Sequence, residues 1–314
     1  MNLRRLKYFV SIVDIGSLTQ AAETLHIAQP ALSQQLITLE AEFRQKLLIR
    51  TQRGVIPTEA GQALYRHAQI ILRQFEQARQ DVGNASQALC GKVSVGLVPG
   101  TAASVLAVPL LKNVRELHPG ILLYLNESMG ANLHAQVLSG AIDMAVLYGA
   151  HAAQGLTVQV LVNEPLCLVA PSCLDLGSGV LPLEALAPLD LILPHPDSYL
   201  RQHIEEVLSQ QGIVVPAVAT IESAIPLAGA IAAGLGACIL PASAGRVIAL
   251  ASGAHLYMLD HPAATVPLSL CMSTYQPLSE PASTVKDILL ELTVDFAEDL
   301  HQQGAGLAIG LAAS

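Results

Sequence analysis

The chain has 314 residues, too many for one small core, so we expect two or three domains. Hydrophobic residues make up 52% and charged residues only 13%, a composition that excludes a predominantly disordered protein. The net charge of -9 is unevenly distributed: residues 1–92 carry 11 Lys and Arg against 7 Asp and Glu, whereas residues 93–314 carry 5 against 18. A basic head on an acidic body is typical of a nucleic-acid-binding domain joined to a sensing domain.

The N-terminal segment predicts three helices. Residues 3–13 repeat apolar side chains at helical spacing, which indicates an amphipathic helix. Residues 17–43 predict two shorter helices around a tight turn, because Ser17 and Gln20 form a capping box and Pro30 fits the first turn of a new helix. The core stripe expected on the last of these helices consists of Leu32, Leu36, Leu39 and Phe43.

The opposite face of that last helix is small and polar near its N-terminus, and no acidic residue of the helix precedes Glu40. A helix–turn–helix inserts such a face into the major groove of DNA, where its N-terminal residues reach base edges. An ordinary helical hairpin is the alternative, because this pattern is common by chance. The residues expected to face the bases are Gln29, Pro30, Ser33 and Gln34.

Residues 47–57 predict a strand, a turn and a second strand, from which two arginines project. A hairpin of this kind beside a helix–turn–helix acts as a wing that contacts phosphates or the minor groove. The residues expected to hold the DNA backbone or the minor groove are Arg50, Thr51 and Arg53.

A long helix is predicted after the hairpin. Thr58 is placed to cap it, with Glu59 in its first turn. From Ala68 to Leu89 its apolar residues recur at alternating spacings of three and four, which is the heptad seam of a coiled coil. We favour a linker helix that pairs two copies of the chain; packing on its own domain is the alternative.

After residue 90 the predicted elements alternate between strands and helices, as in a parallel α/β sheet. Two such runs joined by two crossings predict two subdomains, with a ligand-binding cleft at the carboxyl ends of the strands. The expected strands are 92–98, 121–127, 140–147, 165–170, 189–193, 214–221, 237–241 and 266–272, and the expected helices are 102–117, 131–139, 199–210, 223–233 and 283–296.

Six residues at turns that precede helices are the candidate effector contacts in this cleft: Thr101, Ser104, Ser128, His195, Ser198 and Ser223. Each alone is more often a helix cap than a ligand contact. If they converge on one cleft, they favour a carboxylate or another small anion, because free backbone N–H groups at a helix N-terminus attract negative charge.

Several enzyme classes lack their signatures in this sequence. Gly234 and Gly236 close a helix instead of opening one, and no G-x-S-x-G, H-E-x-x-H or P-loop motif occurs. The five cysteines form no C-x-x-C pair, and none stands beside a histidine at metal-ligand spacing. We therefore expect buried thiols, with no metal and no cofactor. A redox switch through Cys167 and Cys173 is a lesser alternative.

No export signal or membrane anchor is expected. Residues 1–10 carry three charges and no long apolar run, unlike a secretory signal. The apolar segment 304–314 is too short to span a bilayer, and we expect it to be a disordered end or a packing strip.

Taken together, the N-terminal motifs resemble those of the LysR-type transcriptional regulators. The matching motifs are GSLTQAA at 16–22, QPALSQQ at 29–35, LE at 39–40, LIRT at 48–51 and PTEAG at 57–61, with looser matches at 99–104, 143–148 and 221–223. The segments 3–9 and 25–30 most resemble a subgroup of the family that controls nitrogen assimilation. One departure is Ala28, where many members of the family carry Ser or Thr; Ala is a poor N-cap, so Gln29 is the residue left to serve there.

The resemblance implies an α/β protein with an N-terminal winged helix–turn–helix, a long linker helix and a regulatory domain like a periplasmic binding protein. The expected domains are 1–58 for DNA binding, 59–89 for the linker (dimerisation) helix, 90–298 for effector binding and 299–314 for a C-terminal tail. Within the regulatory domain, subdomain 1 takes 90–164 and 268–298, and subdomain 2 takes 165–267.

The expected function is sequence-specific transcriptional regulation, without catalysis, at an interrupted inverted repeat in promoter DNA. The resemblance implies a cytoplasmic homodimer joined by the linker helix and a homotetramer of two dimers, with RNA polymerase as a further candidate partner and no membrane partner. Its activity would follow a small anionic effector, nitrogen status or the amount of protein alone. The alternative is a cytoplasmic small-molecule-binding protein without a role on DNA, which leaves residues 1–90 unexplained.

Overall fold

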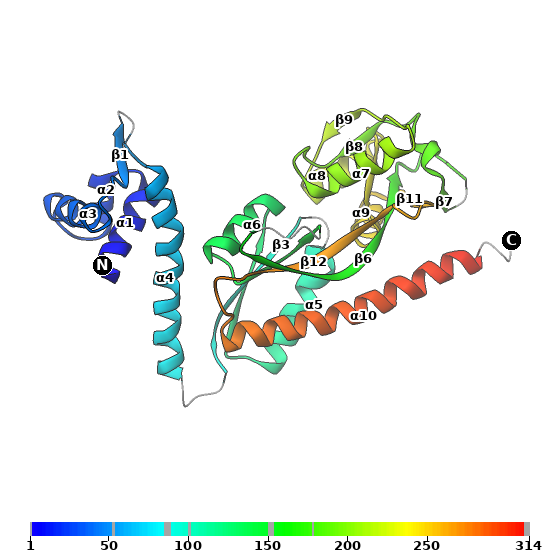
Figure 1. Cartoon of the computed structure of the whole chain (residues 1–314). Coiled ribbons are helices and arrows are strands. Elements are labelled where there is room, and N and C mark those ends of the chain that lie inside the picture. The colour runs from blue at the N-terminus through cyan, green and yellow to red at the C-terminus, as the bar shows by residue number, and fades with distance from the viewer. Residues whose placement is uncertain are drawn as a thin grey trace. The chain divides into compact units, whose positions relative to one another are not determined.

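The computed structural model describes residues 2–51, 54–84, 89–99, 102–149, 154–177 and 179–310. Contacts divide the chain into two compact units, with the elements from α1 to α4 in the first and those from β3 to α10 in the second. Figure 1 labels the elements of both units.

The first unit begins with three helices, as the sequence predicts: α1 (Leu3–Ile15), α2 (Leu18–Thr24) and α3 (Gln29–Phe43). Ser17 caps α2, and its side chain accepts a hydrogen bond from the backbone N–H of Gln20. The helices enclose a small core in which Leu6, Phe9 and Leu32 are almost fully buried. This packing fixes which face of α3 remains outside.

A two-stranded hairpin and a long helix complete the first unit. Strands β1 (Leu48–Thr51) and β2 (Gly54–Pro57) pair antiparallel. Helix α4 (Glu59–Asn84) follows, and the hydroxyl of Thr58 accepts a hydrogen bond from the N–H of Gly61 at 2.9 Å, which confirms the predicted cap. The hydroxyl of Tyr65 on α4 donates to Asp14 of α1 and joins the two helices.

The second unit is built on a sheet that contains ten strands within the described residues. Its first portion holds β3 (Gly91–Leu97), β4 (Ile121–Glu127) and β5 (Met144–Tyr148), with β3 parallel to both others. Helices α5 (Ala102–Leu117) and α6 (Gly130–Ser139) connect these strands, so the predicted β–α–β–α–β run is confirmed.

The second portion of the sheet holds the strands β7 to β11, together with three α-helices and a short 3₁₀ helix. In chain order these elements are β7 (Val180–Leu181), η1 (Leu183–Leu186), β8 (Leu191–Leu193), α7 (Tyr199–Gln210), β9 (Ala217–Thr220), α8 (Ala224–Ala232), β10 (Ala237–Pro241), α9 (Ala242–Ser252) and β11 (His255–Leu259). Helix α7 has the predicted bounds. The elements β7, η1, α9 and β11 have no counterpart among the predicted ones.

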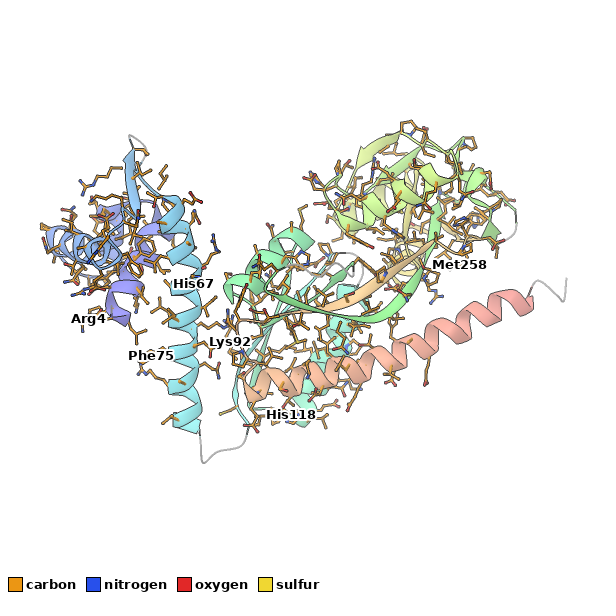
Figure 2. The ribbon with its side chains drawn as sticks, in the orientation of Figure 1. Arg4, His67, Phe75, Lys92, His118 and Met258 are labelled. Atoms are coloured by element: carbon orange, nitrogen blue, oxygen red, sulfur yellow. The ribbon has the colours of Figure 1, made fainter. Side chains whose placement is uncertain are left out.

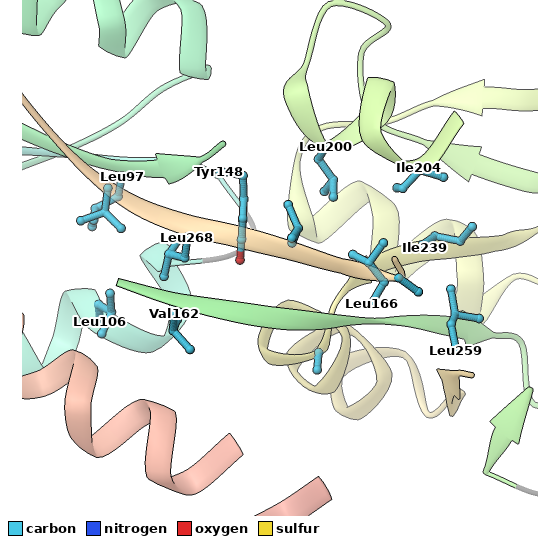
Figure 3. Packing of buried hydrophobic residues seen from close by; sticks show 14 of the residues in the cluster. Leu97, Leu106, Tyr148, Val162, Leu166, Leu200, Ile204, Ile239, Leu259 and Leu268 are labelled. Atoms are coloured by element: carbon cyan, nitrogen blue, oxygen red, sulfur yellow. The ribbon is translucent and has the colours of Figure 1, made fainter. Parts of the chain in front are cut away.

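Two long strands, β6 (Leu156–Ala170) and β12 (Thr265–Ser273), connect the two portions and run antiparallel side by side (Figure 1). The predicted crossing strand at 165–170 is only the second part of β6. Its first part pairs with β12, whereas residues from Leu166 onward pair with β10 and β11. One continuous core spans both portions, and Figure 3 shows part of it around the crossing strands.

The last helix, α10 (Glu280–Gly310), is longer than the predicted helix 283–296. It packs against α5, β3 and β6, with Val285 and Leu289 fully buried. The alternative of a disordered end is wrong for the backbone of 304–310, which continues α10, whereas the alternative of a packing strip stays a prediction. Residues 311–314 lie outside the described residues.

Candidate functional site

The helix–turn–helix is formed by α2, α3 and the turn between them. Leu25 is the C-cap of α2, and His26 adopts a left-handed conformation with φ of 54° that reverses the chain. Helix α3 then begins with Pro30 in its first turn, while Ala28 occupies the N-cap and makes no side-chain hydrogen bond. The departure at Ala28 therefore leaves this end of α3 without the usual hydroxyl cap.

One face of α3 is buried and the opposite face is exposed, largely as predicted. Leu32 and Leu39 belong to the core, whereas Pro30 and Gln34 are exposed and Gln29 and Ser33 are half-buried. Ile37 continues the exposed face one turn further and is 50% exposed. A helix face of small and polar residues with its N-terminal turn uncovered is the surface that a major groove accepts.

The prediction that Phe43 belongs to the core stripe is wrong. Phe43 is the last residue of α3 and is 42% exposed. Arg44 follows it in a left-handed conformation with φ of 52° and ends the helix there. The side chain of Phe43 therefore lies at the end of α3 and is not packed in the core. Sequence periodicity does not show where a helix stops when a non-glycine residue adopts the capping conformation.

Glu40 connects α3 to the hairpin, a role that the sequence did not reveal. Its carboxylate accepts hydrogen bonds from the backbone N–H of Leu47 at 2.9 Å and from Lys46 Nζ at 2.6 Å, and Leu48 N lies 3.5 Å away. Burial raises the pKa of Glu40, but these donors outweigh burial and hold the pKa below its ordinary value. The start of β1 is thereby tied to the C-terminal half of α3.

The hairpin carries two of the three predicted backbone-binding residues within the described structure. Arg50 and Thr51 are exposed on β1, and the hydroxyl of Thr51 donates to the carbonyl oxygen of Gly54 at 3.2 Å. Arg53 lies outside the described residues. The hairpin is held against the helices because the N–H of Val55 donates to the carbonyl oxygen of Gly16 at 2.7 Å.

The apolar seam of α4 is buried in its first part and exposed in its second part. Its first member, Ala68, is buried in the core of the first unit together with Leu64, which precedes the seam. Further along the helix, Phe75 and Val82 are 46% and 80% exposed (Figure 2 labels Phe75). Self-packing therefore accounts for the first part of the seam and leaves the second part uncovered.

A cavity of about 330 Å³ lies in the second unit, between the two portions of the sheet. Its walls come from β5 and β10, from the residues that directly follow β3, β8 and β9, and from α6, α7, α8 and α9. Most of its lining is apolar, with contributions from Met129, Leu147, Leu227, Leu240 and Ile248. The polar lining residues are His134, Asp197, Ser198, Gln202 and Glu222, together with the tyrosines Tyr148 and Tyr199.

The charges around this cavity differ from those of an anion site. Two carboxylates, Asp197 and Glu222, belong to the lining, and none of its described residues is lysine or arginine. Burial lowers the pKa of His134, which favours a neutral imidazole at pH 7. The lining therefore suits an uncharged, mainly apolar molecule better than a carboxylate.

Of the predicted effector residues whose side chains the structure describes, only Ser198 belongs to the lining of this cavity, and it also caps α7 by accepting from the N–H of Arg201 at 3.2 Å. Ser128 and Ser223 flank the lining without joining it, although Ser223 does occupy the N-cap of α8. Within the described contacts, His195 Nδ1 accepts from the N–H of Asp197 at 3.2 Å, which closes the turn. Thr101 and the side chain of Ser104 lie outside the described residues.

The residues that the sequence analysis missed in this cavity are mostly aromatic or apolar. Tyr148 ends a buried strand, and Tyr199 begins a helix and stacks on His203 at 5.9 Å between ring centroids. Their positions at the carboxyl ends of strands and at helix starts are the available signal.

The cysteines of the chain are not paired with one another in the described structure. All five cysteines are free; Cys167, Cys238 and Cys271 are buried, Cys90 is half-buried and Cys173 is exposed, so the expectation of buried thiols fails for Cys173. Burial raises the pKa of the Cys167 thiol to about 12, which disfavours a redox pair with Cys173.

Within the described ranges, no cluster of His, Cys, Asp and Glu is suited to a metal ion. None of the described helices has the length and apolarity needed to cross a bilayer.

Comparison with protein families gives two matches that together cover most of the chain. Residues 3–62 match the bacterial regulatory helix–turn–helix protein of the lysR family, and residues 86–293 match the LysR substrate binding domain. The nitrogen assimilation regulatory protein nac of Klebsiella aerogenes is 50% identical over 292 residues, covering 93% of this chain and 95% of that protein. The protein of that name from Escherichia coli K12 is 46% identical over the same shares of both chains.

Solved structures give the same architecture. A full-length OxyR variant from Pseudomonas aeruginosa superposes with a TM-score of 0.68 at 21% identity, covering 93% of this chain and 94% of that one. Full-length CbnR in complex with its target DNA superposes with a TM-score of 0.54 at 21% identity, covering 93% of this chain and all of that one. At these identities the likeness concerns the fold.

Proposed function

Because the chain belongs to the LysR family of DNA-binding transcriptional regulators, we propose that it acts at promoters of nitrogen-assimilation genes. The family assignment supports DNA binding itself. The nitrogen role is supported by 50% identity to the nac protein of Klebsiella aerogenes across nearly both chains. The observation that carries the proposal in this molecule is the exposed N-terminal face of α3 beside the hairpin.

We assign sequence reading to α3 and backbone contacts to the wing, defined here as β1 and β2. The proposed base-contacting residues are Gln29, Pro30, Ser33 and Gln34, and the proposed phosphate or minor-groove contacts are Arg50, Thr51 and Arg53. Glutamine is suited to bidentate contact with adenine, and arginine to phosphates and the narrow minor groove. Glu40 supports both sets, because it binds the backbone between α3 and the wing.

The proposed assembly is a homodimer through α4 and a homotetramer of two such dimers. Support for the dimer comes from the uncovered seam at Phe75 and Val82, which a second copy of the helix can bury. Two DNA-binding domains related by a two-fold axis require two half-sites related by the same axis, which is an interrupted inverted repeat. Joining two domains also compensates for the small excess of positive charge on a single domain.

The domain assignment follows the same proposal: 1–58 binds DNA, 59–89 pairs copies, 90–298 regulates, and 299–314 extends the chain beyond the regulatory part. The cavity in the second unit is the proposed effector site. Its apolar lining, its two carboxylates and the lack of Lys or Arg among its described residues favour an uncharged effector over the anion expected from the sequence. We propose that the protein acts by binding, in the cytoplasm where its DNA target lies, with RNA polymerase as a candidate partner.

The decisive experiment measures binding of the purified full chain to the DNA upstream of its own gene, across a salt series, against scrambled DNA of equal length. Specific binding that weakens with salt supports the proposal, since phosphate contacts release counterions. Binding without any added molecule would further support control by the amount of protein. Equal affinity for both DNAs at every salt concentration, with small-molecule binding retained, would instead favour a binding protein without a role on DNA.

A further inference from the structure

Glu164 is a buried carboxylate at the junction between the two portions of the second unit. It lies on β6, and its side chain is 0% exposed. Its neighbour across the strand pair is Val266 of β12, and β6 leaves β12 for β10 and β11 within the next three residues. A carboxylate at such a position is costly unless its oxygens are hydrogen-bonded, so its contacts require an explanation beyond core packing.

The two oxygens of Glu164 bind different portions of the unit. The hydroxyl of Tyr148, at the end of β5, donates to Oε1 at 2.7 Å. The backbone N–H of Ser243, in the first turn of α9, donates to Oε2 at 3.2 Å. Burial raises the pKa of Glu164, and these hydrogen bonds together with the charge of Arg246, one turn further along α9, act against that rise without cancelling it. One side chain thus joins β5 to the N-terminus of α9.

Both ends of this connection reach the cavity. Tyr148 is a lining residue from the first portion, and Figure 3 shows it among the core residues of the crossing strands. From the second portion, Leu240 precedes α9 and Ile248 lies within it, and both belong to the lining. The carboxylate that accepts from the Tyr148 hydroxyl on one wall is therefore also the acceptor at the N-terminus of α9 on the other.

We propose that Glu164 is a positioning residue that couples the two walls of the cavity, so that displacement of Tyr148 on one wall loosens the N-terminus of α9 on the other. The coupling runs from the Tyr148 hydroxyl to the Ser243 amide through the Glu164 carboxylate. It would serve regulation only if the cavity binds an effector, and in that respect it rests on the proposed function.

The test is hydrogen exchange at the Ser243 amide in the full chain, comparing wild type with Tyr148→Phe. Removing the hydroxyl frees Oε1 and lets the carboxylate rotate or take up a proton, so exchange at Ser243 should rise about 10-fold relative to the amides of β4. The matched control is Tyr257→Phe, because Tyr257 is also buried, lies outside the cavity lining, and its hydroxyl accepts from the N–H of Leu176 at 3.1 Å. The control should leave Ser243 exchange unchanged.

A second variant covers the case in which Tyr148→Phe unfolds the unit. Glu164→Gln keeps the shape of the side chain but weakens it as an acceptor, so it should also raise exchange at Ser243 above that at β4. Unchanged exchange at Ser243 in the folded variants, or an equal rise in Tyr257→Phe, would overturn the coupling. DNA affinity measured on the same samples is independent: its absence in wild type would refute the proposed regulator and leave the coupling standing.

Discussion

The backbone N–H of Leu47 donates a hydrogen bond of 2.9 Å to the carboxylate of Glu40. Leu47 directly precedes β1, and Glu40 lies in the last turns of α3. The two elements that we propose to contact DNA are thus held together by a buried side chain on the core side of α3. Their relative placement matters because base contacts and backbone contacts must be made at the same time.

Replacing Glu40 should destabilise the first unit. Glu40→Ala leaves the N–H groups of Leu47 and Leu48 without their acceptor, and an orphaned buried donor costs about 1–3 kcal/mol. Lys46 is mostly exposed, so its ion pair contributes little of this loss. Urea unfolding of the full chain, with hydrogen exchange at Leu47, measures the effect. Glu23→Ala, at an exposed position on α2, is the control and should change stability far less.

The contribution of Glu40 should also depend on pH. Its pKa in the folded protein is lowered from the ordinary value of 4.5 by Lys46 and two backbone donors acting against burial. A lowered folded pKa stabilises the protein fully above the unfolded pKa, and this stabilisation is lost as the pH falls through the folded value. The stability difference between wild type and Glu40→Gln should therefore be constant near pH 7 and shrink below about pH 4.5. A difference that grows with acid would contradict this assignment.

Gly54→Ala should disrupt the wing. A Cβ on Gly54 would lie 2.2 Å from the carbonyl oxygen of Gly16, and the φ of 131° is one that other residues rarely adopt. We expect a loss of stability of roughly 1–3 kcal/mol and weaker DNA binding, measured by thermal unfolding and by titration with DNA. The control is Gly229→Ala on α8, where a Cβ has open space; it should be neutral or slightly stabilising.

Gln34→Ala should reduce sequence specificity. Gln34 is exposed on the proposed base-reading face of α3, and loss of a good base contact costs about 1–3 kcal/mol. Affinity for the target site should fall by that amount while affinity for scrambled DNA stays the same. Parallel titrations of both DNAs decide the matter, and an equal loss on the two would remove Gln34 from base reading.

Arg50→Ala should behave in the opposite way. Arg50 is exposed on β1, where a guanidinium suits phosphates instead of base edges. Binding to target and scrambled DNA should weaken about equally, and the slope of log affinity against log salt should become shallower by about one unit. An unchanged slope would exclude Arg50 from the phosphate contacts.

Phe75→Glu should separate the copies of the chain. The uncovered part of the α4 seam includes Phe75, and burying a charge in a helix–helix interface is strongly unfavourable. Sedimentation velocity should show a shift toward smaller species, with loss of high-affinity binding to the inverted repeat but not to a single half-site. Gln74→Glu, which adds the same charge at a polar position outside the apolar seam, should leave the assembly intact.

Local signals in the sequence determined the first unit and many elements of the second. Caps and apolar spacing were sufficient for α2, the cap of α4 and the bounds of α7, because these features depend on residues within a few positions of one another. The same signals identified the exposed positions of Pro30 and Gln34 on α3. The start of β6 was missed, although Val158, Val160 and Val162 recur at strand spacing there.

Only the tertiary structure decided which distant residues meet. Glu40 bonds to Leu47 and Leu48 because Arg44 turns the chain after α3, and Glu164 joins Tyr148 to Ser243 because β6 crosses between two portions of one sheet. The apolar character of the cavity likewise depends on side chains from six separate helices and strands and from the turns that follow other strands. Periodicity shows which face of an element is buried, but the partner across that face is fixed by long-range packing, which a local pattern does not encode.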